Sequence, residues 1–254
     1  MHKLALILFS ALSFATSSAF AASYQQTDGT IVDPILNLDG SVSTYSGPDL
    51  RPDTAYAEVL GSFGVDLTGI DLSGSSAPSF TASHMPDADV RGFVSTGVFS
   101  VISAPNADFR GVSIDLQIVE SGGGGASLES ADFRQSELNA TGGGSAVFAW
   151  TDDLNLRQVD FSGANLQSFN FTPIGGGEAD ITGANFSNAV LANVIGLGSL
   201  SGSAFYNANT DFTGATDQFG RFDPVAAGWT LVPEPSTALL MGLGLAGLAT
   251  RRRR

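Results

Sequence analysis

The chain contains no cysteine among its 254 residues, and Lys3 is its single lysine. Disulfides, thiolate metal sites and cysteine nucleophiles are therefore excluded, and no lysine is present to complete a phosphate-binding loop in the Gly-rich runs. Histidine occurs only as His2 and His84, too few for a zinc site or a histidine-based catalytic set. Because Ser83–Pro86 reads as an irregular loop, we expect His84 to be a solvated surface residue.

Basic residues are also scarce. Five of the eleven, Lys3 and Arg251–Arg254, lie at the two ends of the chain. The remainder carries six arginines against 25 acidic residues, a formal charge near −19. Such a charge repels polyanions, so nucleic acid is not expected as a partner. Six arginines spread from Arg51 to Arg221 also argue against a clustered acid–base site, and we predict a protein that is not an enzyme.

Acidic residues are plentiful but do not form a recognisable metal site. Asp152 and Asp153, followed by Asn155, are the densest group, and they lack the glycine and distal glutamate of an EF-hand loop. No catalytic residue, metal ligand or cofactor is predicted, although weak Ca²⁺ binding between acidic rows stays open.

The N-terminal segment, 1–21, has the organisation of a secretory signal peptide. His2 and Lys3 precede an apolar helix-forming run, Leu4–Phe14, and Ala19 and Ala21 form a small-x-small site for signal peptidase. Residues 22–64 follow as a leader or cap without a clear period.

From Val65 the sequence repeats every five residues as small, Asp or Asn, apolar, Ser/Thr/Arg, then Gly or small. Uninterrupted triplets occupy 126–140, 159–173 and 179–193. A period of five fits neither a helix nor a plain strand, and it suits a chain that turns a corner every five residues. The central apolar residues then form a buried ladder. Its predicted members are Leu67, Leu72, Val90, Phe109, Leu128, Phe133, Leu138, Phe161, Leu166, Phe171, Ile181, Phe186, Leu191 and Phe212.

This pattern resembles the pentapeptide-repeat family over 65–230. The resemblance implies an all-β fold, a right-handed quadrilateral β-helix with four repeats per coil; the alternative is a β-sandwich. The triplets at 159–173 and 179–193 leave room for one unit between them, which predicts a four-sided coil with Ile174–Glu178 as its degenerate fourth side. Gly-rich runs at 122–125, 142–144 and 175–177 and the irregular stretch Ser75–Pro86 are expected to interrupt the array. Trp229 is expected to pack over the open C-terminal end.

The last residues, Val232–Arg254, combine three features in a short space. Pro233, Glu234 and Pro235 form an extended motif, because proline fixes its own φ and pushes the preceding residue out of the helical region. Ser236–Thr250 is uncharged and apolar. As a helix it measures about 22 Å, short of the hydrocarbon core of about 30 Å, so we predict transient rather than permanent membrane residence. Arg251, Arg252, Arg253 and Arg254 are expected on the cytoplasmic side.

Residues 231–254 resemble the PEP-CTERM sorting signal of Gram-negative bacteria. The resemblance implies export, transient inner-membrane association through a transmembrane helix, and processing near Pro233–Pro235 by an exosortase. It further implies a final place at the cell surface or in the extracellular matrix, with a structural or adhesive role linked to exopolysaccharide and biofilm. A polysaccharide-acting β-helix enzyme and a calcium- or ligand-binding surface protein are the alternatives.

Overall fold

The computed structural model describes residues 22–45, 47–57, 60–119, 126–138, 147–149, 153–173, 177–217 and 219–233. The elements are β1 (Tyr24–Gln25), β2 (Ile31–Val32), β3 (Leu36–Asn37), β4 (Leu60–Asp66), β5 (Ser76–Ala77), β6 (Phe80–His84), β7 (Val94–Ser103), β8 (Ser113–Val119), β9 (Ala126–Ser127), β10 (Val147–Ala149), β11 (Leu154–Asn155), β12 (Ala179–Asp180), the 3-10 turn η1 (Leu197–Ser199), β13 (Leu200–Ser201), β14 (Phe205–Tyr206), β15 (Thr216–Asp217), β16 (Gly220–Arg221) and β17 (Thr230–Leu231).

Regular structure in the described residues is almost entirely β, which confirms the predicted all-β class. In that part of the chain η1 is the only helical element, and no helix there is long and apolar enough to cross a membrane. The predicted signal helix and the predicted C-terminal helix fall at 1–21 and 236–250, outside the described residues.

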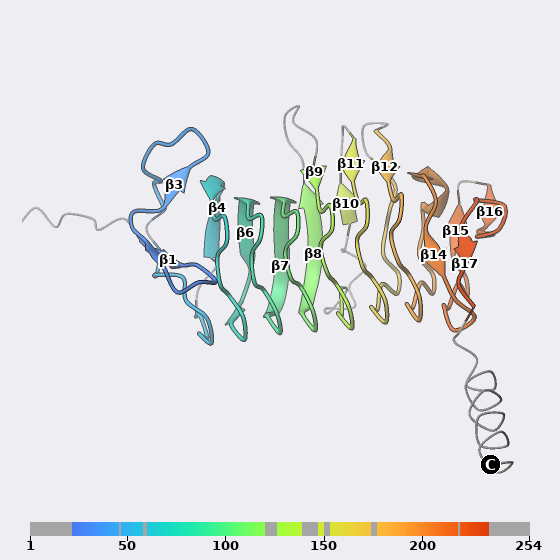
Figure 1. Cartoon of the computed structure of the whole chain (residues 1–254), viewed down its shortest axis with the longest axis horizontal. Helices are drawn as coiled ribbons and strands as arrows, with labels where there is room; N and C mark the ends of the chain where they lie inside the picture. The colour runs from blue at the N-terminus through green and yellow to red at the C-terminus, as the bar shows by residue number, and fades with distance from the viewer. Residues whose placement is uncertain are drawn as a thin grey trace, which may run out of the picture.

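From β4 to β13 the strands stack in parallel, one coil of the chain upon the next (Figure 1). β4 pairs with β6, β6 with β7 and β7 with β8, all in parallel, so that Phe80, Phe99 and Leu116 share one register. Shorter strands continue the stack through β9, β11, β12 and β13. Each coil turns its apolar side chains inward, and the core therefore runs along the length of the stack.

The second residue of each five-residue unit pairs with its counterpart in the neighbouring coil. One such row is made by parallel bridges that join Asp71, Asp89, Asp108, Asp132, Asp160 and Asn185 in succession. The coils differ in length along this row. The step from Asp71 to Asp89 is the shortest in sequence, and the step from Asp132 to Asp160 is the longest.

The predicted register of this coil is wrong. Leu154 pairs with Ala179 and Asp160 pairs with Asn185, so equivalent positions lie 25 residues apart instead of 20, and Ile174–Glu178 is not the fourth side. The first side of that coil is Leu154–Gln158, a unit that lacks the small first residue and the glycine of the pattern. The side before the insertion is 169–173, because Asn170 bridges Ile195. An inserted segment, 174–178, separates that side from the next coil.

The longer coils contain the Gly-rich runs. The segment from Asp108 to Asp132 includes 122–125, and the segment from Asp132 to Asp160 includes 142–144. These two runs lie outside the described residues, as do the first two glycines of 175–177.

The predicted interruption at Ser75–Pro86 is also wrong, because these residues form β5 and β6 and pair in parallel within the stack. Phe80 and Ala82 are buried, so buried and less buried side chains alternate along this strand with a period of two. A search for a five-residue repeat does not detect such a side of the coil. The leader covers the first coil. There β1 pairs with β2 and β3 with β4, both antiparallel, and Tyr24 and Ile35 are buried.

A column of aromatic rings fills the interior. Phe109 and Phe133 stack with ring centroids 4.6 Å apart, and the stack continues from Phe133 to Phe161 at 5.3 Å and from there to Phe186 at 5.1 Å. These spacings follow the separation of about 4.8 Å between neighbouring strands. Trp229 stacks on Phe186 at 5.0 Å and closes the column, as predicted. All the predicted ladder residues are buried except Phe212, which is partly buried.

The fifth residue has a positive φ in most of the regular units, whether or not it is glycine. Gly92 has φ 65°, and Gln135 has φ 58° at the equivalent place. This left-handed conformation makes each corner and explains the preference for Gly or a small polar residue there.

Replacing Gly196 by alanine is expected to lower the free energy of unfolding by about 2–5 kcal/mol. Its φ is 80°, and a Cβ atom would lie 2.7 Å from the backbone nitrogen of Thr172. Gly92→Ala is the matched control, since its φ is 65° and no atom lies within 4 Å of the added Cβ. The control should lose only about 1–2 kcal/mol. Urea unfolding of both variants measures the difference, and equal losses would contradict the close approach at Gly196.

Candidate functional site

The acidic and amide side chains of the repeat hold its turns. Where the second residue of a unit is Asp or Asn, its side-chain oxygen accepts a hydrogen bond from the backbone N–H two residues later, as Asp66 does from Thr68 at 3.1 Å. The residues that do this are Asp66, Asp71, Asp89, Asp108, Asp132, Asn155, Asp160, Asn165, Asn170, Asp180, Asn185 and Asp211. Only a short side chain with an acceptor oxygen makes this bond, which accounts for Asp and Asn at this position.

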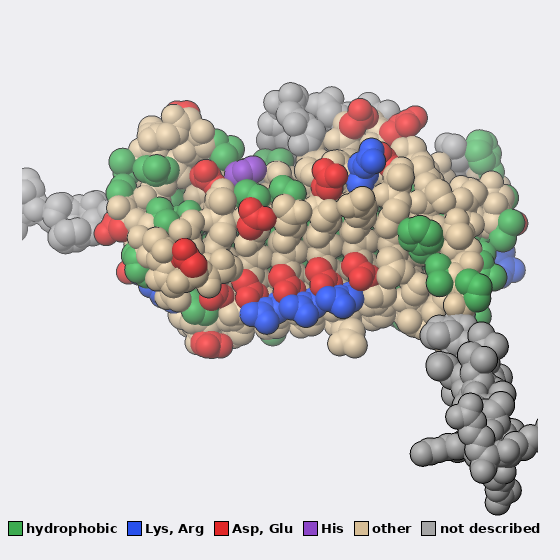
Figure 2. All heavy atoms as spheres, in the orientation of Figure 1, with side chains coloured by type: hydrophobic (Ala, Val, Ile, Leu, Met, Phe, Trp, Pro, Cys, Tyr) green, Lys and Arg blue, Asp and Glu red, His purple; other side chains and the backbone are tan. Residues whose placement is uncertain are grey.

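Three arginines join the acidic row into a continuous ladder across one face. The Arg–Asp ladder consists of Asp89, Arg91, Asp108, Arg110, Asp132, Arg134 and Asp160, and its charged groups form a row in Figure 2. Each arginine donates from Nε to the aspartate two residues before it, Arg110 to Asp108 at 2.8 Å. Each also approaches the aspartate of the next coil, with Nε of Arg110 3.6 Å from Oδ2 of Asp132.

The pKa of Asp108 shows how these contacts compete. Partial burial raises this pKa, but hydrogen bonds from the side chain and backbone of Arg110, with the charges of Arg110 and Arg91, outweigh burial. The net result is a pKa below the usual value. In return, the hydrogen bond and charge of Asp108 raise the pKa of Arg110. The contacts with Arg110 and Arg91 therefore favour the ionised form of Asp108.

Replacing Asp108 by alanine should lower the unfolding free energy by about 1–2 kcal/mol, because both the turn hydrogen bond and the arginine pairing are lost. Asp108→Asn is the matched control, since Asn185 shows that an amide makes the same turn. The control should lose only about 0.5 kcal/mol, the value of a partly exposed ion pair. Equal losses in denaturant unfolding would contradict the turn role.

The stability difference between the parent protein and Asp108→Asn should depend on pH. Because the pKa of Asp108 is lowered in the folded state, its stabilising effect is fully present above the unfolded value of about 3.9. It is lost as pH falls through the folded pKa. The stability difference between the parent and Asp108→Asn should therefore be constant near neutral pH and shrink below about pH 4. A difference that grows on acidification would contradict this sign.

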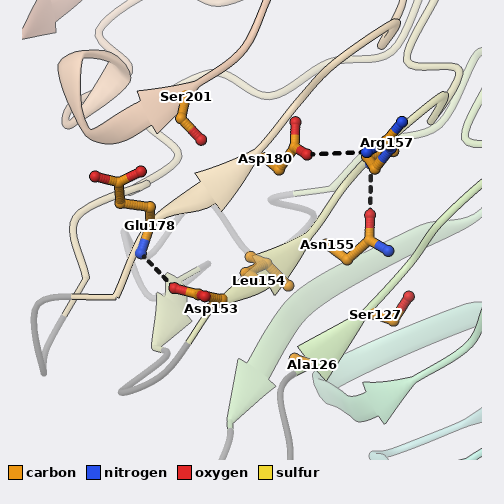
Figure 3. Close-up of a pocket in the computed structure, with 9 residues that line it drawn as sticks. All are labelled: Ala126, Ser127, Asp153, Leu154, Asn155, Arg157, Glu178, Asp180 and Ser201. Atoms are coloured by element: carbon orange, nitrogen blue, oxygen red, sulfur yellow. Dashed lines mark hydrogen bonds and ion pairs between the residues drawn. The ribbon is translucent and has the colours of Figure 1, made fainter.

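A groove of about 540 Å³ lies beside β9, β11, β12 and β13 (Figure 3). Its lining is polar: Ala126, Ser127, Asp153, Leu154, Asn155, Arg157, Glu178, Asp180 and Ser201.

Hydrogen bonds and one ion pair organise the groove. Arg157 Nη1 lies 3.6 Å from Oδ2 of Asp180, and the backbone N–H of Arg157 donates to Oδ1 of Asn155 at 3.0 Å. The Glu178 N–H donates to Oδ1 of Asp153 at 3.3 Å. Three carboxylates against one guanidinium suit hydroxyl-rich neutral ligands or cations better than anions. Within the described ranges, no three His, Asp or Glu side chains are placed to hold a metal ion together.

The predicted site residues fall in different places. His84 lies in β6, where it pairs with Asp66 and Ser103 and is half-buried, so the expected surface loop is wrong. The sequence did not predict this strand, because β6 alternates with a period of two and does not follow the five-residue pattern. Of the acidic pair, Asp153 lines the groove and Asp152 lies outside the described residues.

The two ends of the chain are only partly described. Pro233 is exposed directly after β17. Glu234, Pro235, the arginine cluster 251–254, and Ala19 and Ala21 of the signal peptide lie outside the described residues.

The PEP-CTERM protein-sorting motif matches residues 231–254. The chain therefore carries the signal of an exported protein that passes through the membrane and is processed by an exosortase. No curated protein matches the chain.

Proposed function

We propose that this chain is a structural or adhesive protein of the cell surface or extracellular matrix, linked to exopolysaccharide and biofilm. The supporting observation is the sorting motif placed immediately after a long stack of parallel coils. Exosortase would remove the tail at the membrane, after signal peptidase has removed residues 1–21. The released body would then reach the surface or matrix.

We further propose that the body is a right-handed quadrilateral β-helix of the pentapeptide-repeat kind. The five-residue turns, the buried central residues and the parallel bridges between coils support this assignment. Insertions beyond four units lengthen some coils, as 174–178 do before β12. Such a body presents similar polar groups in successive coils, at the strand spacing of about 4.8 Å.

The Arg–Asp ladder is the surface that we assign to polysaccharide. Its arginines are 42–50% exposed and each one is matched by carboxylates, so the face is polar without a strong local charge. Beside it, Arg110, Arg134 and Gln135 line a cavity of about 370 Å³. Paired donors and acceptors of this kind suit the hydroxyl groups of a neutral polysaccharide. The acidic body as a whole repels an acidic one.

A co-sedimentation experiment with the host's exopolysaccharide tests this function. The parent protein should pellet with the polymer, and Arg110→Ser with Arg134→Ser should reduce the pelleted fraction. Serine is the residue of the next coil, Ser162, at the same place in its unit, so the double variant should keep its fold. Arg221→Ser, at an exposed position of β16 that lines neither cavity, is the matched control and should pellet like the parent.

The same incubation separates a binder from an enzyme. Free oligosaccharides in the supernatant would reject the structural function in favour of a polysaccharide-acting enzyme. The groove with Asp153, Glu178 and Asp180 would then be the place to look for its acid and base. No pelleting with the polymer would overturn the adhesive function.

A further inference from the structure

We propose that the C-terminal end of the stack is a membrane-contact surface, which lies against the lipid interface while the sorting tail is anchored. The partner is the boundary between lipid headgroups and acyl chains. This inference rests on the membrane step of the proposed function and adds a role for the folded body in it. The surface is defined by Phe205, Phe219, Val225, Leu231 and Val232.

These residues leave apolar area in water at one end of the molecule. Phe219 is 89% exposed between β15 and β16, and Val225 is 70% exposed in the turn that follows. Leu231 in β17 is 54% exposed. Figure 2 shows hydrophobic side chains on the surface at this end. Single exposed apolar residues are ordinary, whereas a group of them indicates a binding surface.

The covalent connection to the tail identifies the partner. Val232 is followed by Pro233, Glu234 and Pro235, and the apolar run begins at Ser236. Four residues span at most about 14 Å even when fully extended. The headgroup layer on one side of a bilayer is itself about 5–8 Å thick. When the apolar run is in the membrane, the last coil is therefore held within a few ångströms of the lipid.

The charges at this end favour an apolar contact over an electrostatic one. Asp217 and Asp223 flank the surface, with Arg221 as the neighbouring cation. This acidic balance gives no attraction to anionic headgroups. The depth of Phe219 in the interface should consequently change little with salt.

The opposite end provides an internal comparison. The cap at 36–42 exposes Leu38 and Val42 at 56% each, and it lies at the other end of the stack from β17 (Figure 1). It is comparably apolar but is not tethered by the sorting tail. Membrane contact at Phe219 and none at Leu38 would identify the tether and the surface together as the cause.

Spin labels on single cysteines measure this directly, because the chain has no cysteine of its own. Phe219→Cys, Leu38→Cys and Leu240→Cys are labelled in protein taken from the membranes of an exporting host that lacks exosortase. Each protein is reconstituted into vesicles of phosphatidylethanolamine and phosphatidylglycerol. The high exposure of positions 219 and 38 means that labels there should not disturb the fold.

For each label we measure the ratio of its accessibility to oxygen over its accessibility to a water-soluble nickel complex. This ratio should be several-fold higher at positions 219 and 240 than at position 38. A label at 219 that is as accessible to nickel as the one at 38, while 240 is protected, would overturn the inference and leave the sorting step intact. A label at 240 that is also in water would overturn the membrane step itself.

Discussion

Replacing Phe133 by alanine is expected to lower the free energy of unfolding by about 3–5 kcal/mol. The ring is fully buried, and it stacks between Phe109 at 4.6 Å and Phe161 at 5.3 Å. Alanine would leave a cavity in the middle of the column. The neighbouring coils cannot collapse into this space, because their backbones are held at the strand spacing by bridges such as Asp108↔Asp132.

Phe219→Ala is the control for this substitution. Its side chain is 89% exposed, and the loss should stay within about 0.5 kcal/mol. Both variants are unfolded in urea and followed by circular dichroism. Since each coil contacts only its neighbours, a weakened central coil should also broaden the transition of Phe133→Ala. A loss below about 1 kcal/mol would contradict a packed aromatic column.

Deleting Pro233–Arg254 should move the protein from the cell envelope and matrix to the soluble periplasm or the medium. The deletion removes the sorting motif, the apolar run and the arginine cluster. The fold should persist, because the last described contact of the stack, from the Val232 N–H to the Tyr206 carbonyl, remains. Cell fractionation with immunoblotting measures the redistribution.

The control is a chain in which only Glu234 is replaced by alanine. It keeps the apolar run and the arginines, so it should still reach the inner membrane. A change in the motif alone should interfere with processing, and uncleaved protein should accumulate there. An unchanged distribution of the deletion protein would reject the sorting role of the tail.

The sequence predicted those features of the fold that depend on single units. The inward side chains, the polar turn residues and the glycine corners follow from steric and hydrogen-bonding demands within one unit. Register depends instead on coil length. The unit Leu154–Gln158 was not recognised as a side of the coil, because its first residue is large and its last is Gln158 rather than glycine. The strand Phe80–His84 follows a period of two.

The Arg–Asp ladder was missed for the same reason. Asp89 and Arg91, and likewise Asp108 and Arg110, are visible in the sequence as pairs with one residue between them. Their connection across coils appears only when coils of unequal length are laid side by side. The groove was equally hidden, since Asp153, Asp180 and Ser201 come from three different coils.

The C-terminal residue of the exported protein shows directly whether the sorting tail is removed, and intact-mass and peptide mass spectrometry determine it. In cells that contain exosortase, we predict a chain that ends near Pro233–Pro235 and lacks Arg251–Arg254. In cells without exosortase, the membrane-bound protein should retain all four arginines. Exported protein that still ends at Arg254 in the presence of exosortase would show that the tail is not a processed sorting signal.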